Sequence, residues 1–163
     1  MRLHNRIALI TGAGRGIGRA IAEHYSREGA RVAVADLDYE TAQEVAEIIN
    51  SAGGSAMALA MDVTDEQAVE QGVSSVVETW GGLDIVLANA GIQHIAPLHE
   101  LSFNHWRQVM SVHLDGAFLL TRSALQAMYA KGGGTILYMG SVHSLEASPL
   151  KAPYVAAKHG MLG

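Results

Sequence analysis

The chain has 163 residues, 49% of them apolar and 17% charged, which is enough for one globular domain with a buried core. A net charge of −5 argues against nucleic acid or an anionic membrane as a partner, and no apolar run is long enough to cross a membrane. Without cysteine there are no disulfides and no thiol chemistry, and a cytoplasmic setting is expected.

Apolar runs alternate with stretches of helical periodicity along the whole chain. Strands are expected at residues 6–11, 31–36, 55–61, 83–88 and 135–139. Helices are expected at residues 17–28, 39–51, 65–80, 102–130 and from 152 onward, and most of them are closed by glycine. This alternation predicts an α/β fold with a doubly wound parallel sheet between two layers of helices, in a single domain spanning residues 1–163.

The predicted sheet is incomplete at its C-terminal side. The last helix stops with the chain about three turns after it begins, and the strand at 135–139 is left as an exposed edge. Because proteins normally protect such edges, we expect a C-terminal truncation, with the last strands missing and the fragment inactive by itself. A naturally short five-stranded sheet is the alternative.

The link between the first strand and the first helix is rich in glycine, with the spacing Gly12-x-x-x-Gly16-x-Gly18. Glycine lets the backbone approach a pyrophosphate closely, and the N-terminus of the following helix offers free N–H groups and a positive dipole. We therefore predict dinucleotide binding by this loop, including Arg15 and Ile17. An ordinary tight turn is the alternative.

Asp36 ends the second strand, about 24 residues after the first glycine of the loop. A carboxylate there can accept a hydrogen bond from an adenosine ribose 2′-hydroxyl and would repel a 2′-phosphate. Arg15 would attract that phosphate, but Leu37 supplies no second cation, so NAD is expected rather than NADP. Alternatively, Asp36 is a turn residue or caps the next helix.

Polar residues also follow the third and fourth strands, where a parallel sheet binds ligands beyond its carboxyl ends. Asp62, followed by Val63, is a candidate to bind the adenine amino group. Asn89 is a candidate to brace the loop beneath the cofactor. Each of the two polar residues is alternatively an ordinary turn residue.

A hydroxyl, a phenol and an ammonium lie in the last quarter of the sequence. Tyr154 and Lys158 are four residues apart, just after Pro153, so they share one face of the predicted helix. A neighbouring lysine cation favours the phenolate form of tyrosine, which allows proton transfer with an alcohol. Ser141 could fold back to hold the substrate oxygen. A chance surface pair is the alternative for Tyr154 and Lys158.

The chain contains eight histidines. Those at 94, 99 and 105 have no zinc-site spacing and no cysteine partner, so we expect no metal site.

As a set, these motifs resemble the short-chain dehydrogenase/reductase family along the whole chain. The resemblance rests on the glycine loop, Asp62, Asn89-Ala90-Gly91, Ser141 and the Tyr154-x-x-x-Lys158 pair. It implies a Rossmann-type fold, a nicotinamide cofactor, tyrosine as the general acid/base, and lysine holding the ribose. Family members are longer, which agrees with the expected truncation.

A narrower resemblance is to bacterial D-3-hydroxybutyrate dehydrogenases. It rests on residues 89–94, 140–144 and 151–160, and it implies that Gln93, His143 and Lys151 hold the substrate carboxylate. The implied reaction is the NAD-dependent interconversion of (R)-3-hydroxybutyrate and acetoacetate. The alternatives are a reductase acting on 3-oxoacyl or other ketones, a nucleotide-binding module without catalysis and, for His143 and Lys151, solvated loop residues.

His113 departs from the family pattern, which usually has asparagine at this position in the long helix. The residue shares a face with Trp106, Met110 and Ala117. Two interpretations remain open. His113 either takes part in catalysis by carrying a water relay to Lys158 through its carbonyl, or it is a hydrogen-bonded core histidine.

The predicted helix at 102–130 is apolar on nearly all sides, and a sheet can cover only one of them. The simplest cover for the other side is the same helix of a second copy, and the family resemblance implies a homotetramer. The alternative is that a missing C-terminal segment covers this side.

Overall fold

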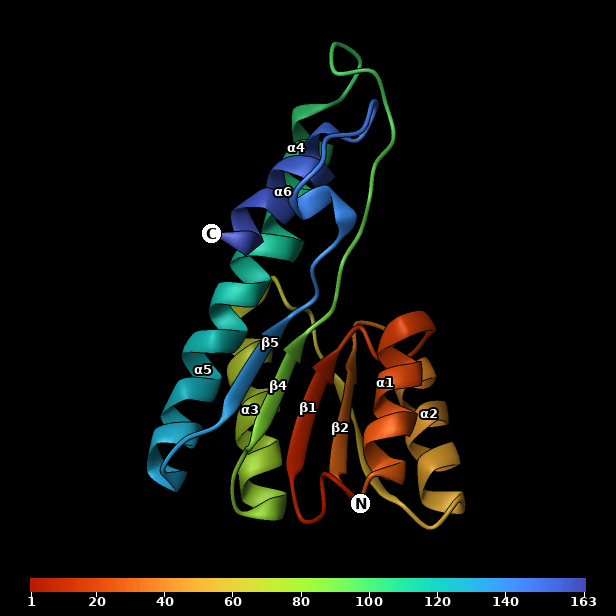
Figure 1. Ribbon diagram of the computed structural model, residues 1–163, viewed down its shortest axis with the longest axis vertical. Helices are drawn as coiled ribbons and strands as arrows, with labels where there is room; N and C mark the ends of the chain where they lie inside the picture. The colour runs from red at the N-terminus through yellow and green to blue at the C-terminus, as the bar shows by residue number, and fades with distance from the viewer.

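The computed structural model describes residues 1–163 and contains one parallel sheet with helices on both faces (Figure 1). The strand order is β3-β2-β1-β4-β5. The strands are β1 (Ile7–Thr11), β2 (Arg31–Asp36), β3 (Ser55–Ala60), β4 (Ile85–Ala88) and β5 (Thr135–Tyr138). This confirms the predicted fold class. Because the chain order reverses between β1 and β4, the carboxyl ends of these two strands flank the switch point at which such sheets bind ligands.

The helices begin and end within a few residues of their expected limits. They are α1 (Gly16–Arg27), α2 (Tyr39–Ser51), α3 (Glu66–Trp80), α4 (Phe103–Met110), α5 (Gly116–Lys131) and α6 (Ala152–Leu162). The side chains of Asp38, Asp65 and Ser102 accept backbone N–H bonds at the starts of α2, α3 and α4. Such caps are typical of helix N-termini, where four N–H groups have no partner within the helix.

Alternating side chains of the central strands build two cores. Leu9 of β1 packs into the core on the face covered by α3 and α5, together with Val73 and Leu120. Its neighbour Ile10 packs into the core on the face covered by α1 and α2, together with Val45. Burial of each such side chain contributes about 1.5–3 kcal/mol, so continuous apolar runs belong in the middle of the sheet.

The expected single helix at 102–130 is interrupted. A π-helical turn, η1 (Ser111–Asp115), separates α4 from α5, although the three segments follow one another without a loop. Gly132 ends α5 in the left-handed conformation, with φ +91°. The π turn carries His113, and single π turns are frequent at functional sites. Periodicity alone could not reveal it, because a π turn shifts the helical register by only one residue.

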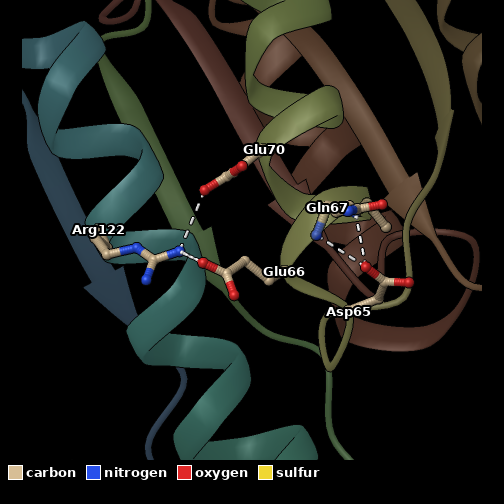
Figure 2. A network of polar contacts seen from close by, with 6 residues as sticks. Asp65, Glu66, Gln67, Glu70 and Arg122 are labelled. Carbon is tan, nitrogen blue, oxygen red and sulfur yellow. Dashed lines mark hydrogen bonds and ion pairs between the residues drawn. The ribbon is translucent and has the colours of Figure 1, made fainter.

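In this single chain one side of α5 packs on the core and the other side is open to solvent, which is the side that the sequence analysis expects a second copy to cover. Leu120 and Met128 face the core, whereas Phe118 and Tyr129 are exposed. Figure 2 shows Arg122 of α5 reaching α3, where it contacts Glu66 and Glu70. The next strand, β5, is the exposed edge that the sequence predicts, with neighbours on one side only.

The segments beyond the carboxyl ends of the strands stand apart from the sheet. There α4 and α6 pack against each other above β4 and β5 (Figure 1). A short 3₁₀ turn, η2 (Val142–Ser144), packs against α6. In none of the helices is the apolar stretch long enough to span a bilayer.

Candidate active site

A cleft of about 550 Å³ opens at the carboxyl ends of β1 to β4. It lies at the switch point, and most of the residues predicted to bind a cofactor line it. The predicted residues in the lining are Gly12, Arg15, Ile17, Gly18, Asp36, Asp62, Val63 and Asn89. Sequence reasoning missed Leu37, Met61, Ile92 and Val112, which also line the cleft. The first three follow the ends of strands, where a parallel sheet binds ligands, so their positions along the chain could have identified them.

The glycines of the loop are required by close approach. A Cβ on Gly18 would lie 2.3 Å from the carbonyl oxygen of Gly12, and one on Gly12 would lie 2.8 Å from the Cα of Ala90. Gly16 is not part of the cleft lining. Its φ of +57° is one that other residues rarely adopt, and the space beside its Cα is open.

Asn89 ties this loop to the end of β4. Its side-chain amide donates to the carbonyl oxygens of Thr11 at 2.9 Å and Gly12 at 3.1 Å. In return, the Thr11 hydroxyl accepts the backbone N–H groups of Asn89 at 3.1 Å and Ala90 at 3.2 Å. The two loops are thus held as one unit beneath the cleft. No side chain caps the N-terminus of α1, so its first N–H groups are available to an anion.

Asp36 is buried, with its carboxylate turned toward the glycine loop. One carboxylate oxygen accepts the Gly14 N–H at 2.9 Å, and the other accepts the Asp38 N–H at 3.2 Å. The helix cap, which was the alternative role for Asp36, belongs to Asp38, whose side chain accepts the Thr41 N–H. Asp36 therefore places a negative charge in the cleft wall, where a bound ribose could meet it.

Asp62 lies in the wall of the cleft and also forms a turn. One oxygen of its carboxylate accepts the Thr64 N–H at 2.9 Å and the Thr64 hydroxyl at 2.7 Å, which closes the turn. Its second carboxylate oxygen has no hydrogen-bond partner within the chain.

Tyr154 and Lys158 lie one turn apart on α6. The Lys158 ammonium is 5.6 Å from the centroid of the Tyr154 ring. Lys158 is only 3% exposed, and its ammonium donates to the Met139 carbonyl oxygen at the end of β5. Burial lowers the pKa of Lys158 below the ordinary lysine value, because water no longer stabilises the charge. The buried ammonium thus ties α6 to the end of β5 and lies next to the Tyr154 ring.

The turn that follows β5 brings Ser141 to the same region. The Ser141 hydroxyl accepts the His143 N–H at 3.2 Å, and the Ser141 N–H donates to the Ser144 hydroxyl at 3.1 Å, so the turn is pinned from both ends. The His143 ring stands perpendicular to the Tyr154 ring, with the ring centroids 5.9 Å apart. The segment that carries Ser141 therefore lies beside the Tyr154 phenol.

His143 is held in one tautomer by two contacts. Its Nε2 lies 3.3 Å from the Lys151 ammonium, which can only donate, so Nε2 accepts. Its Nδ1 then carries the proton and donates to the Glu146 carbonyl oxygen at 3.1 Å. This contact brings Lys151 close to the ring that abuts Tyr154. Gln93, the third predicted substrate residue, is exposed on the segment between β4 and α4.

His113 is buried at the centre of this group. Its Nε2 lies 2.9 Å from the Ile92 carbonyl oxygen and 3.2 Å from the Ile92 N–H, while its Nδ1 has no partner. Burial lowers the pKa of His113, and the Lys158 charge lowers it further, so the ring is neutral near pH 7. Its ring stands nearly perpendicular to the Tyr154 ring, at 82°, with the ring centroids 5.3 Å apart. The interpretation as a hydrogen-bonded core histidine holds for Nε2 and not for Nδ1.

Comparison with known proteins shows the family to which the chain belongs. A family model described as short chain dehydrogenase matches residues 6–163. A sorbitol dehydrogenase from Cereibacter sphaeroides is 38% identical over 163 residues, with 99% of this chain and 62% of that protein covered. A D-threitol dehydrogenase from Mycolicibacterium smegmatis is 36% identical over 162 residues, with coverages of 99% and 62%.

A third relative is 2-(S)-hydroxypropyl-CoM dehydrogenase 3 from Xanthobacter autotrophicus, which is 38% identical over 157 residues, with 96% of this chain and 62% of that protein covered. The chain thus spans 62% of the length of each of these three curated relatives. None of the three is named for 3-hydroxybutyrate.

Proposed function

Because the chain belongs to the short-chain dehydrogenase family, we propose that it forms the dinucleotide-binding domain of an oxidoreductase that interconverts a secondary alcohol and a ketone. One observation carries the proposal: Tyr154, with the Lys158 ammonium 5.6 Å from its ring centroid, lies on the helix that packs against the Ser141 turn. A phenol, a cation and a hydroxyl grouped beside a nucleotide-sized cleft suit proton transfer at an alcohol oxygen.

The residues of the cleft fit a dinucleotide. A volume of about 550 Å³ lies within the range of ligand pockets, and the exposed apolar side chains of Ile17 and Leu37 offer surfaces for flat rings. The glycine loop and the open N-terminus of α1 suit the pyrophosphate. Asp36 favours NAD over NADP, because its carboxylate would repel a 2′-phosphate. When bound, NAD supplies the hydride acceptor, and NADH supplies the donor.

The chain's own residues handle the proton and the substrate oxygen. In the oxidation direction the Tyr154 oxygen takes the proton from the substrate hydroxyl, and in the reduction direction the phenol returns it. The Ser141 hydroxyl orients the substrate oxygen, and Lys158 keeps a positive charge next to the phenol. Positioned proton transfer of this kind contributes about 10²- to 10⁴-fold to a rate.

We propose (R)-3-hydroxybutyrate and acetoacetate as the substrate pair. The Lys151 ammonium, at 3.3 Å from His143 Nε2, lies next to the ring that abuts Tyr154, so a carboxylate held there would lie near the proton-transfer group. Gln93 could add a hydrogen bond from the opposite loop. A 3-oxoacyl or other ketone remains the second candidate within the same chemistry. A polyol is a third candidate, favoured by the names of the sorbitol and D-threitol relatives.

A substrate panel tests these candidates on the protein as the cell makes it. NADH formation is followed with (R)-3-hydroxybutyrate, sorbitol and D-threitol, and NADH consumption with acetoacetate and a 3-oxoacyl thioester. Lys151→Met should raise the KM for hydroxybutyrate by about tenfold or more, since it removes a charge-assisted hydrogen bond, and should leave neutral substrates unaffected. Turnover of a polyol or thioester without turnover of hydroxybutyrate would overturn the assignment.

We also propose that the protein assembles as a homotetramer through the open side of α5. Phe118 and Tyr129 are large exposed side chains there, and Arg122 lies over the Phe118 ring with its Cζ 5.5 Å from the ring centroid. Aromatic and arginine side chains are enriched in such contacts. Sedimentation of the protein tests this assembly, and a stable monomer with full activity would overturn it.

A further inference from the structure

His113 contacts two different parts of the candidate site, which are the segment that follows β4 and the helix that carries Tyr154. Its Nε2 meets the backbone of Ile92 on the wall of the cleft, and its ring packs nearly perpendicular to the Tyr154 ring. It also lies directly beneath Gly91, where an added Cβ would be 2.5 Å from the His113 Cε1 atom. The π turn that carries His113 also places Val112 in the cleft lining.

Nε2 can form only one of its two contacts with Ile92: a protonated Nε2 donates to the carbonyl oxygen and leaves the Ile92 N–H without this acceptor, whereas an unprotonated Nε2 accepts that N–H. The shorter Nε2 contact, at 2.9 Å, is to the Ile92 carbonyl oxygen, which can only accept. A proton on Nε2 satisfies it, and Nδ1 is then an unprotonated nitrogen without a donor. The opposite tautomer would bury an N–H group without an acceptor at Nδ1. His113 therefore acts through Nε2, and its contact with Tyr154 is one of packing.

We propose that His113 is a positioning residue that joins the wall of the cofactor cleft to the proton-transfer tyrosine. Its Nε2–H holds Ile92, and with it the segment from Asn89 to Ile92, while its ring fixes the orientation of the Tyr154 ring. The two contacts belong to different parts of one side chain, so they can be separated. The inference rests on the proposed function, since it assigns a role within the same site.

Two substitutions separate the contacts. His113→Phe keeps an aromatic ring against Tyr154 but removes the hydrogen bond to Ile92. It should weaken NADH binding about tenfold, the 1.4 kcal/mol equivalent of one neutral hydrogen bond, with kcat changed by less than about threefold. His113→Gln places an amide where Nε2 was but removes the ring. It should leave NADH affinity within about twofold and lower kcat about two- to tenfold, the range of one aromatic contact.

NADH fluorescence titration gives the affinity, steady-state kinetics give kcat, and thermal unfolding reports on folding. A merely structural role predicts that both variants lower Tm and the active fraction together, with Kd and kcat per active site unchanged, and this result would overturn the inference. So would equal effects of the two variants on Kd. If His113→Phe does not fold, Gly91→Ala replaces it, because the added Cβ displaces the native ring from Ile92 and should also weaken NADH binding.

The same titration separates this inference from the function on which it depends. If the native protein binds neither NADH nor NADPH, both the proposed function and the role of His113 are wrong. If the native protein binds NADH and the His113 variants bind it and turn over equally well, only the role of His113 is wrong.

Discussion

Asp84 joins three segments at the end of the sheet opposite the candidate site, and removing its charge should destabilise the fold. The residue is 6% exposed and precedes β4. Its carboxylate accepts the Lys131 ammonium at 2.7 Å, the Ile7 N–H at 2.9 Å and the Arg6 guanidinium at 3.1 Å. In Asp84→Asn the side-chain oxygen can still accept from Ile7, while the attraction to Lys131 is lost.

The size of the expected loss of stability in Asp84→Asn follows from how exposed the partners of Asp84 are. Arg6 is largely exposed and contributes little, because exposed ion pairs are screened by solvent. The Lys131 side chain is 35% exposed, so its charge-assisted bond belongs near the lower end of the 1.5–3 kcal/mol range, at about 2 kcal/mol. For a chain of this length, that loss corresponds to a decrease in Tm of about 4–8 °C.

The dependence on pH provides an internal check. Burial disfavours the Asp84 charge, but the hydrogen bonds from Lys131, Ile7 and Arg6 outweigh burial and hold the pKa of this carboxyl below its ordinary value. A lowered carboxyl pKa stabilises the fold above the ordinary value of about 3.9, and that contribution is lost as the pH falls through the folded pKa. The native protein and Asp84→Asn should therefore differ at pH 7 and converge below about pH 4.

Urea unfolding at pH 7 and at a series of acidic pH values measures both effects. Glu23→Gln is the matched control, since Glu23 pairs with Arg19 one turn away on the surface of α1, and its loss should change stability by less than about 0.5 kcal/mol. A change at pH 7 no larger than that of Glu23→Gln, or a difference that persists unchanged below pH 4, would refute the reasoning.

Three further predictions concern the candidate site and the proposed assembly. Asp36→Ala should improve NADP binding, because it removes the carboxylate that repels the 2′-phosphate, by up to about 4 kcal/mol at contact, and leaves Arg15 to attract that phosphate. Unchanged NADP affinity in a titration would place Asp36 away from the ribose. Lys158→Met should raise the free energy of unfolding by about 1 kcal/mol while abolishing turnover, because the native fold buries a charged ammonium at a cost in free energy. At pH values above the ordinary lysine pKa of about 10.4 the ammonium is neutral in both states, so this gain in stability should disappear. A loss of stability at pH 7 would contradict the argument. Phe118→Glu should shift the protein to smaller species in sedimentation, since a charge on the open side of α5 opposes its burial against a second copy, and an unchanged assembly would place the contact elsewhere.

Much of the fold follows from local information. Apolar runs bounded by glycine predict the strands, because strands buried on both faces need continuous apolar sequence. Asp65 and Ser102 are recognisable helix caps, because capping depends on the side chain and on N–H groups two or three residues away. The glycine loop is likewise local, since the spacing of glycines reflects the turn between β1 and α1. These features are properties of short segments.

Other features depend on contacts between segments that are far apart in the sequence. From the sequence Asp36 could be either a ribose ligand or the cap of α2, and only the tertiary structure, in which Asp38 caps the helix and the Gly14 N–H approaches Asp36, assigns the Asp36 carboxylate to the cleft. The hydrogen bond that fixes the His143 tautomer comes from Lys151, and its position depends on how the loop before α6 returns to the 3₁₀ turn.

His113 illustrates the same division within one residue. Its burial follows from the apolar face of the helix, a pattern that the sequence displays. Its contacts with Ile92 and Tyr154 do not, because those residues lie 21 and 41 positions away and meet it only when three segments pack together. Helical periodicity specifies which way a side chain points along its own helix, whereas its partners depend on the angles at which helices and loops cross. Those angles are set by the packing of the whole domain.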